Sequence, residues 1–210
     1  MTDDMRELIK NTLIMLAITL IAGGILGVVY QVTKEPIAKM EERTRGEACK
    51  EVFKDAEDFP EGAIDITSMT KAFEENEIDG VELTKKFDAL ASDGSKLGVV
   101  YEITSHEGYG GDIVWYIGIR NDGTTNGISI TSISETAGLG MRAEEVLVPQ
   151  FTDKTAASFK LMKGNASKDD EIDAISSATV TSKAIIGGVN AALVYFNAND
   201  AENNGGDSDE

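Results

Sequence analysis

The longest apolar run of the chain covers residues 12–30, where no charged side chain occurs. Its length is close to the ~20 residues that a helix needs to cross the hydrocarbon of a bilayer. A buried soluble helix would carry a polar stripe, and a cleavable signal peptide would have a shorter apolar core and an Ala-x-Ala-like end. We therefore predict an uncleaved transmembrane helix over 12–32 that follows a short cytoplasmic start, residues 1–11.

The next segment changes from apolar to charged residues with good helix propensity. The charged pattern continues from Lys34 to about Asp58, and Phe59-Pro60-Glu61-Gly62 then breaks it. We predict a helical stalk over residues 33–60, in which Cys49 is a small packed residue. Residues 63–93 have a mixed pattern that supports no assignment.

Three later runs have the pattern of β-strands. Residues 97–105 and 112–120 are rich in β-branched and aromatic side chains, and residues 127–134 alternate between isoleucine and polar side chains. Asn121-Asp122-Gly123 is a turn signal between the second and third runs. Residues 141–149 and 155–163 resemble short helical or irregular pieces. The pattern predicts an α+β fold in which an antiparallel sheet packs against helices.

A last helix is predicted to begin near Thr179 or Thr181. Apolar side chains recur there at helical spacing, at Val180, Ala184, Ile185, Val189, Ala192, Leu193 and Phe196. Asp173 and several hydroxyl residues precede the helix, and such residues cap helix N-termini, where the dipole also favours a phosphate. A capped helix with spare hydroxyls is the alternative interpretation. The domain is thus predicted to cover residues 61–197, and residues 198–210 to form a disordered acidic tail.

Composition excludes several classes of function. The net charge of −18 argues against nucleic acid as a partner. Cys49 is the only cysteine, so that an intrachain disulfide, a zinc site with several cysteines and a cysteine-held iron–sulfur cluster are excluded. His106 is the only histidine, and neither a nucleophile elbow nor a Walker loop occurs. We predict no catalytic residue and no metal site.

Two glycine-bearing loops flank the strand-like runs. The first is Gly108-Tyr109-Gly110-Gly111, and the second is Glu135-Thr136-Ala137-Gly138-Leu139-Gly140. Glycine lets a backbone approach a flat ring closely or adopt a positive φ in a tight turn.

The segment from Asp173 to Thr179 resembles the flavin-attachment motif Asp-x-x-Ser/Thr-x-Ala-Thr of the FMN-binding domain family. Asp173 matches its aspartate, Ser176 its hydroxyl residue, Ala178 its alanine and Thr179 its acceptor threonine. Ser177 stands where the family usually has glycine. The two glycine loops also match the family in order, with Ala137 in place of the usual proline of Glu-Thr-Pro-Gly-Leu-Gly.

The family includes the G subunit of Rnf-type electron transport complexes and the C subunit of sodium-pumping quinone reductases, and the chain is more similar to the former. The resemblance implies that a flavin transferase esterifies Thr179 to the phosphate of FMN. It places Ser176, Ser177, Ala178 and Thr181 near that phosphate. It also implies that the flavin contacts the two loops, at Glu135, Thr136, Gly138, Leu139, Gly140, Gly110 and Gly111.

The implied function is electron relay inside an ion-translocating ferredoxin:NAD oxidoreductase complex, with the other membrane and redox subunits as partners. The chain itself lacks a dinucleotide fingerprint, so that NAD would bind another subunit. A redox sensor and a flavin-free tether are the alternatives. The resemblance implies a single-pass protein of the cell membrane with its domain on the extracytoplasmic side. The flanking basic residues favour the opposite orientation, although this rule has little force for long domains; they are Lys34, Lys39, Arg43 and Arg45.

Overall fold

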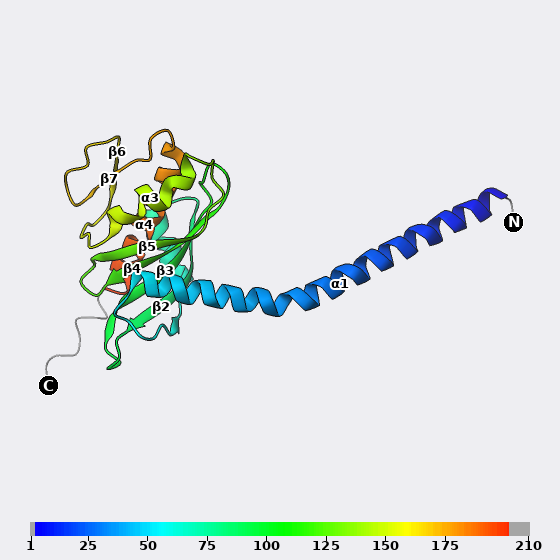
Figure 1. The fold of residues 1–210 in the computed structure, drawn as a ribbon, viewed down its shortest axis with the longest axis horizontal. Coiled ribbons are helices and arrows are strands. Elements are labelled where there is room, and N and C mark those ends of the chain that lie inside the picture. Colours follow the sequence, from blue (N-terminus) through cyan, green and yellow to red (C-terminus); the bar gives the residue numbers. More distant parts are fainter. Residues whose placement is uncertain (1–2, 202–210) are drawn as a thin grey trace. The chain divides into compact units, whose positions relative to one another are not determined.

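The computed structural model describes residues 3–201, which fall into two compact units that meet between Arg45 and Gly46. A single long helix, α1 (Asp3–Val52), forms the first unit, and its last turns belong to the second (Figure 1). The second unit holds all the strands and the remaining helices. The predicted acidic tail lies outside the described residues from position 202 onward.

The apolar part of α1 has the properties of a membrane span. Its most apolar window has a mean hydropathy of 2.5, and none of this window is buried. The hydroxyls of Thr12 and Thr19 donate to carbonyls one turn earlier, Leu8 O and Met15 O, both at 2.9 Å. These bonds satisfy polar groups that would otherwise be costly in lipid. The predicted transmembrane helix is thus helical over its full length.

The end of α1 corrects the predicted stalk. The helix ends at Val52, and residues 53–60 contain no further helix. Its last turns are part of the domain core, where Ala48, Cys49 and Val52 are each at most 3% exposed. The physical reason is tertiary packing, because Val52 and Phe53 join the hydrophobic cluster formed by Phe87, Val100 and Tyr116 of the sheet.

The domain is built on a five-stranded antiparallel sheet with the order β1-β2-β3-β4-β5. Its strands are β1 (Glu61–Gly62), β2 (Val81–Leu90), β3 (Lys96–Ser105), β4 (Ile113–Arg120) and β5 (Thr125–Ser132). The predicted strands correspond to β3, β4 and β5. The unassigned stretch 63–93 holds α2 (Ile66–Glu75) and β2, and the predicted α+β fold is confirmed.

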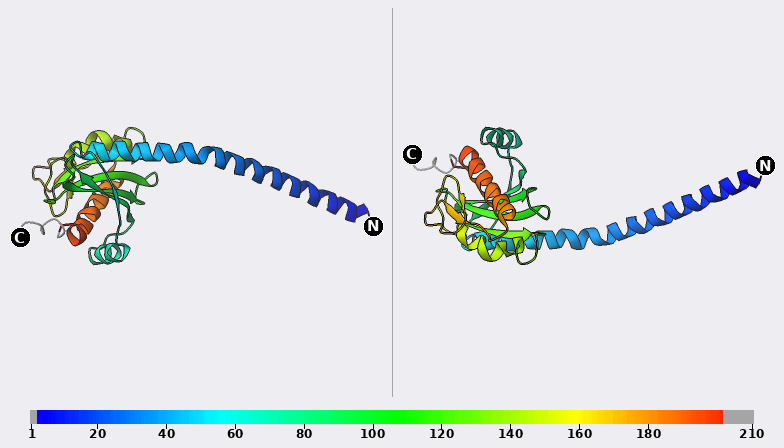
Figure 2. Two further views of the ribbon diagram at one scale, coloured as in Figure 1. Left: turned by 90° about the horizontal axis from the view of Figure 1, so that it is seen from below. Right: turned by 90° about the horizontal axis from the view of Figure 1, so that it is seen from above.

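The sheet has a helix on each face (Figure 2). On one face, α4 (Thr179–Asn199) packs against Tyr101, Ile103 and Trp115. A Cβ on Gly188 would lie 2.4 Å from the Trp115 ring, so that glycine is needed for this close approach. The end of α1 covers the other face, where a Cβ on Gly118 would lie 2.9 Å from Phe53. Although α4 is apolar enough to resemble a span, 67% of its window is buried, which identifies it as a core helix.

Short elements connect β5 to α4. They are η1 (Gly140–Arg142), α3 (Ala143–Val146), η2 (Val148–Phe151), β6 (Lys160–Met162) and β7 (Glu171–Asp173). The helical or irregular interpretation of 141–149 is confirmed, but residues 155–163 contain β6, which pairs in parallel with β7.

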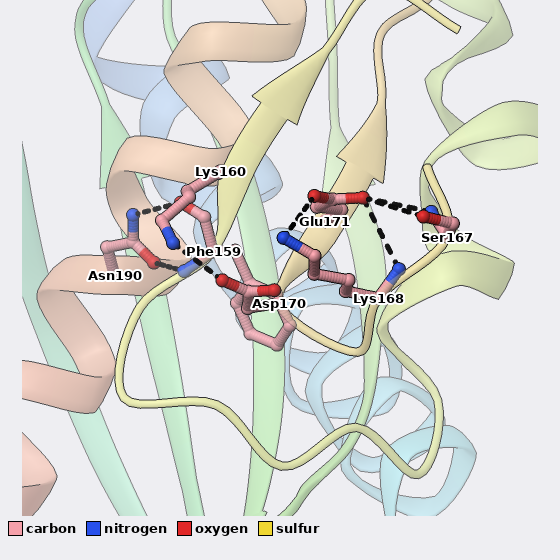
Figure 3. Close-up of polar contacts among 7 residues, drawn as sticks. All are labelled: Phe159, Lys160, Ser167, Lys168, Asp170, Glu171 and Asn190. Atoms are coloured by element: carbon pink, nitrogen blue, oxygen red, sulfur yellow. Dashed lines mark hydrogen bonds and ion pairs between the residues drawn. The ribbon is translucent and has the colours of Figure 1, made fainter. Parts of the chain in front are cut away.

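Two side-chain amides hold this small sheet in place. Gln150 accepts from Asp173 N at 2.8 Å and donates to Asp173 O at 3.1 Å. In the same way Asn190 of α4 accepts from Phe159 N at 2.7 Å and donates to Phe159 O at 3.0 Å (Figure 3). Each amide replaces the hydrogen bonds of a neighbouring strand. The chain that leads from Asp173 into α4 therefore starts from a fixed point.

The C-terminal end of α4 corrects the predicted domain boundary. The helix continues to Asn199, and Asp200, which the sequence places in the disordered tail, is only 2% exposed. The Asp200 carboxylate accepts from Lys86 Nζ of β2 and from the Tyr101 hydroxyl of β3. This buried ion pair between sequence-distant residues fixes the end of α4 to the sheet.

We expect the stability of the domain to fall at alkaline pH because of Tyr101. Burial raises the pKa of the Tyr101 hydroxyl, and the nearby Asp200 carboxylate raises it further. An unfolded tyrosine ionises near pH ~10, so that the stabilisation is fully present below this pH and is lost as the pH rises above it. Thermal unfolding of the full chain in detergent, measured from pH 8 to 11 (about one unit or more on each side of that pKa), should show a steeper loss for the wild type than for Tyr101→Phe. Equal slopes would contradict the prediction.

Candidate functional site

Three segments that are far apart in the sequence enclose one cavity of about 370 Å³. The first is the loop that carries Tyr109, the second is the Glu135–Gly140 loop, and the third is the start of α4. The lining residues are Tyr109, Glu135, Thr136, Leu139, Gly140, Ser177, Ala178, Thr179, Val180 and Thr181. This volume is in the usual range of small-molecule sites, ~300–1,000 Å³.

The glycines of both loops allow neighbouring segments to pack closely. A Cβ on Gly110 would lie 2.0 Å from Ser134 O, and a Cβ on Gly140 would lie 2.6 Å from Thr181 Oγ1. Gly110 N also donates to Glu135 Oε1 at 3.3 Å, which joins the two loops directly. Glycine is therefore required where the second loop meets both the first loop and the first turn of α4.

A small hydrogen-bond network shapes the segment that leads into α4. Ile175 N donates to Ser182 Oγ at 3.0 Å, and Ser182 Oγ donates to Ala178 O at 2.9 Å. Ala178 N donates to Ile175 O at 3.0 Å, which closes a turn. Ser182 is fully buried, so that its hydroxyl serves this turn and is not available to a ligand. The network presents Thr179 at the first position of the helix.

The N-terminus of α4 corrects the prediction of a side-chain cap. Its N-cap residue is Ala178, and no side chain caps the helix. Within the described part of the chain, the hydroxyls of Thr179 and Thr181 have no hydrogen-bond partner, although Thr181 is only 1% exposed. Uncapped N–H groups, the positive end of the helix dipole and the hydroxyl of the lining residue Thr181 together favour an anion. The residues present therefore fit a phosphate group.

The structure brings together most of the residues that the sequence singled out. Those that line the cavity are Ser177, Ala178, Thr179, Thr181, Glu135, Thr136, Leu139 and Gly140. Those that do not line it are Asp173, Ser176, Gly110, Gly111 and Gly138. The Asp173 carboxylate instead accepts from Ala166 N at 3.0 Å, and Gly110 supports the second loop.

Two lining residues were missed by the sequence reasoning. Tyr109 is 74% exposed and Val180 is 48% exposed, and both are large apolar side chains. Tyr109 lies inside the first glycine loop, and its aromatic ring between glycines was the available signal. Helical spacing places Val180 on the apolar face of the helix, but its side chain points to the cavity and solvent.

His106 lies close to the first loop but does not line the cavity. Its Nδ1 atom is 2.9 Å from Asp112 Oδ1, and both side chains are at least half exposed. This pair joins the two ends of the first loop, where the histidine has a structural role.

The backbone at Ser177 has a conformation that glycine adopts more readily than serine. Its φ is +63°, in the left-handed region, which costs an L-residue roughly 1–2 kcal/mol. We expect Ser177→Gly to raise the stability by up to about 1 kcal/mol, since relief of strain is partly offset by the entropy of glycine. Thermal unfolding of the full chain in detergent would measure this, with Ser176→Gly as the matched control. A lower melting temperature for Ser177→Gly would contradict the prediction.

Comparison with known proteins agrees with this arrangement. The model of the FMN-binding domain family matches residues 108–194, and that of the RnfG N-terminal region matches residues 1–52. The chain is thus a protein in which an N-terminal apolar helix precedes an FMN-binding domain. The G subunit of the Na⁺-translocating ferredoxin:NAD⁺ oxidoreductase complex of Acetobacterium woodii is 32% identical over 92% of this chain and 94% of its own length. The chain belongs to the family of G subunits of ion-translocating oxidoreductase complexes.

Other relatives are more distant. The G subunit of the ion-translocating oxidoreductase complex of Pseudomonas aeruginosa is 26% identical over 92% of this chain and 91% of its own length. Among solved structures, the C subunit of the Na⁺-translocating NADH-quinone reductase from Parabacteroides distasonis is 25% identical. The match covers 54% of this chain and 61% of the other, with a TM-score of 0.44.

Proposed function

We propose that this chain is the membrane-anchored flavoprotein subunit that relays electrons within an ion-translocating ferredoxin:NAD oxidoreductase complex. The observation that carries the proposal is the position of Thr179. It stands at the uncapped first turn of α4 and lines the cavity formed with the Glu135–Gly140 loop. The membership of the chain in the G-subunit family and the match to the FMN-binding domain family support the cofactor and the complex.

FMN would supply reversible electron transfer, and the residues of this chain would hold it. We propose a phosphoester between Thr179 Oγ and the FMN phosphate, made by a flavin transferase. In this step Thr179 Oγ would form a P–O bond to the phosphorus of an FMN group that is activated as a phosphoanhydride, and the hydroxyl proton would pass to solvent. The anhydride P–O bond would break, and the activating phosphate would leave with the electron pair of that bond. The uncapped amides of α4 and the Thr181 hydroxyl would then hydrogen-bond the phosphate oxygens. A fixed carrier cannot diffuse away between its electron donor and acceptor.

The attachment is tested on the full chain produced together with a flavin transferase. The protein is denatured and digested, and the peptide that contains residues 173–183 is sequenced by mass spectrometry. We expect a mass increase equal to one esterified FMN on Thr179. If the peptide is unmodified but the protein still binds FMN, the chain would relay electrons through non-covalently bound FMN. A bare peptide from protein that binds no flavin would favour the structural tether.

Membership in a complex is tested separately. An affinity tag on this chain should recover other membrane and redox subunits from mildly solubilised membranes. Flavin on the chain without such subunits would favour a redox sensor.

We also propose that residues 46–210 lie on the extracytoplasmic side of the membrane. The resemblance to the family supports this side, whereas the basic residues after the apolar run of α1 favour the cytoplasm. Fusion of alkaline phosphatase, which is active only outside the cytoplasm, to the C-terminus tests the orientation. Active fusions are expected, and inactive fusions with an active cytoplasmic reporter at the same position would refute it.

A further inference from the structure

Exposed apolar side chains gather around the cavity. Within residues 46–201, five large hydrophobic side chains are exposed: Ile66, Tyr109, Leu139, Met141 and Val180. Three of these line the cavity, and Met141 follows the lining residue Gly140 directly in the chain. Apolar surface that collects in one place usually marks a binding site.

Tyr109 is the most exposed of them at 74%, and it lies on a loop that is held firmly. A Cβ on Gly108 would lie 2.1 Å from Gly111 O, and a Cβ on Gly110 would lie 2.0 Å from Ser134 O, so that the backbone on both sides of Tyr109 is tightly packed. Gly110 N is bonded to Glu135, and His106 pairs with Asp112 across the ends of the loop. A flexible surface loop would not need such packing. Because the backbone around Tyr109 is already ordered, binding of a ligand to this side chain would cost little backbone entropy.

We propose that Tyr109 is a positioning residue whose ring packs against the isoalloxazine of the flavin held at α4, with Leu139 and Val180 as its apolar neighbours. The inference rests on the proposed function. A phosphoester would fix only the phosphate end of FMN, and the ribityl chain would leave the ring free to move. Aromatic side chains stack on flat rings and lose little conformational entropy, because tyrosine has only two side-chain torsions. Tyr109 would thus fix the second end of the cofactor.

The proposal is tested with full-length protein in detergent micelles that carries covalent FMN, its amount measured by mass spectrometry. Two properties are recorded per attached flavin. Time-resolved fluorescence anisotropy reports ring mobility independently of the fluorescence lifetime, and fluorescence yield reports an electron-rich phenol in contact with the ring, which quenches it. The variants are Tyr109→Leu and Tyr109→Phe. Ile66→Ala, which changes an exposed apolar side chain away from the cavity, is the matched control.

We expect Tyr109→Leu to raise the yield several-fold and to lower the anisotropy. Tyr109→Phe should also raise the yield, since phenylalanine is a poor electron donor, but should keep the anisotropy of the wild type. Ile66→Ala should change neither property. Unchanged yield and anisotropy in Tyr109→Leu at equal flavin content would overturn the role of Tyr109 and leave the proposed function intact.

The other outcomes separate the two proposals. If the wild type carries no ester but binds added FMN, the same variants are compared with bound FMN, and the same changes are expected. If the wild type neither carries nor binds FMN, the proposed function and this inference both fail.

Discussion

Replacement of Thr179 by valine is expected to abolish covalent flavin attachment and to leave the fold intact. Valine has the shape of threonine without the hydroxyl that would form the ester. Within the described chain that hydroxyl has no hydrogen-bond partner, so that its loss leaves no protein group unsatisfied. The side chain is also only partly buried. We therefore expect the free energy of unfolding to change by less than about 0.5 kcal/mol, as for substitutions away from the core.

The controls for Thr179→Val separate chemistry from structure. Thr179→Ser keeps a hydroxyl at the same backbone position and should retain some attached FMN. Thr181→Val removes the hydroxyl of a neighbouring lining residue, which would contact the phosphate without forming the ester, so that attachment should be reduced but not lost. Denatured samples are compared by flavin fluorescence in gels and by mass spectrometry. Attachment that persists in Thr179→Val would instead assign the ester to another hydroxyl, such as that of Ser176 or Ser177.

The parts of the fold that the sequence predicted are those with a local periodic signal. The alternation of Ile128 and Ile130 with polar residues marked β5, and the helical spacing of Ala184, Ile185 and Val189 marked α4. The start of α4 was predicted because hydroxyls before an apolar helical pattern have a direct physical meaning. The flavin-attachment role of this segment is implied only by its resemblance to the motif of the FMN-binding domain family. Ser182 takes part in the turn before α4, whereas Thr179 and Thr181 do not. This difference depends on side-chain directions, which the sequence does not show.

The features that were missed depend on long-range packing. β6 and β7 have three residues each, too few for a periodic pattern, and they are held by Gln150 and Asn190 from other elements. The end of α1 was predicted from local composition, but Val52 is buried because the sheet covers it. Tyr109 stands between glycines, but this local signal does not show what the ring faces, and the positions of the second loop and α4 identify it as a lining residue.

Asp200 is the other residue whose replacement should have a large effect. Asp200→Ala would leave Lys86, whose side chain is only 13% exposed, without the carboxylate that it contacts. It would also remove the acceptor of the buried Tyr101 hydroxyl. Loss of one partner from a buried ion pair costs roughly 3–5 kcal/mol, because the remaining charge stays desolvated. We expect a correspondingly large fall in the melting temperature of the full chain in detergent, followed by the circular dichroism of the domain.

Matched variants show whether burial of the charge is the cause. Lys71 and Glu75 form an ion pair whose side chains are 76% and 64% exposed, so that Glu75→Ala should cost only about 0–1 kcal/mol. Lys86→Met combined with Asp200→Ala should recover part of the stability lost in Asp200→Ala, because the double variant no longer buries an unpaired charge. An Asp200→Ala protein as stable as Glu75→Ala would mean that the end of α4 is not fixed by the Lys86–Asp200 pair. Thr179 stands at the other end of α4. Loss of the Lys86–Asp200 pair, which destabilises the C-terminal end of α4, should therefore also lower the amount of flavin attached at Thr179.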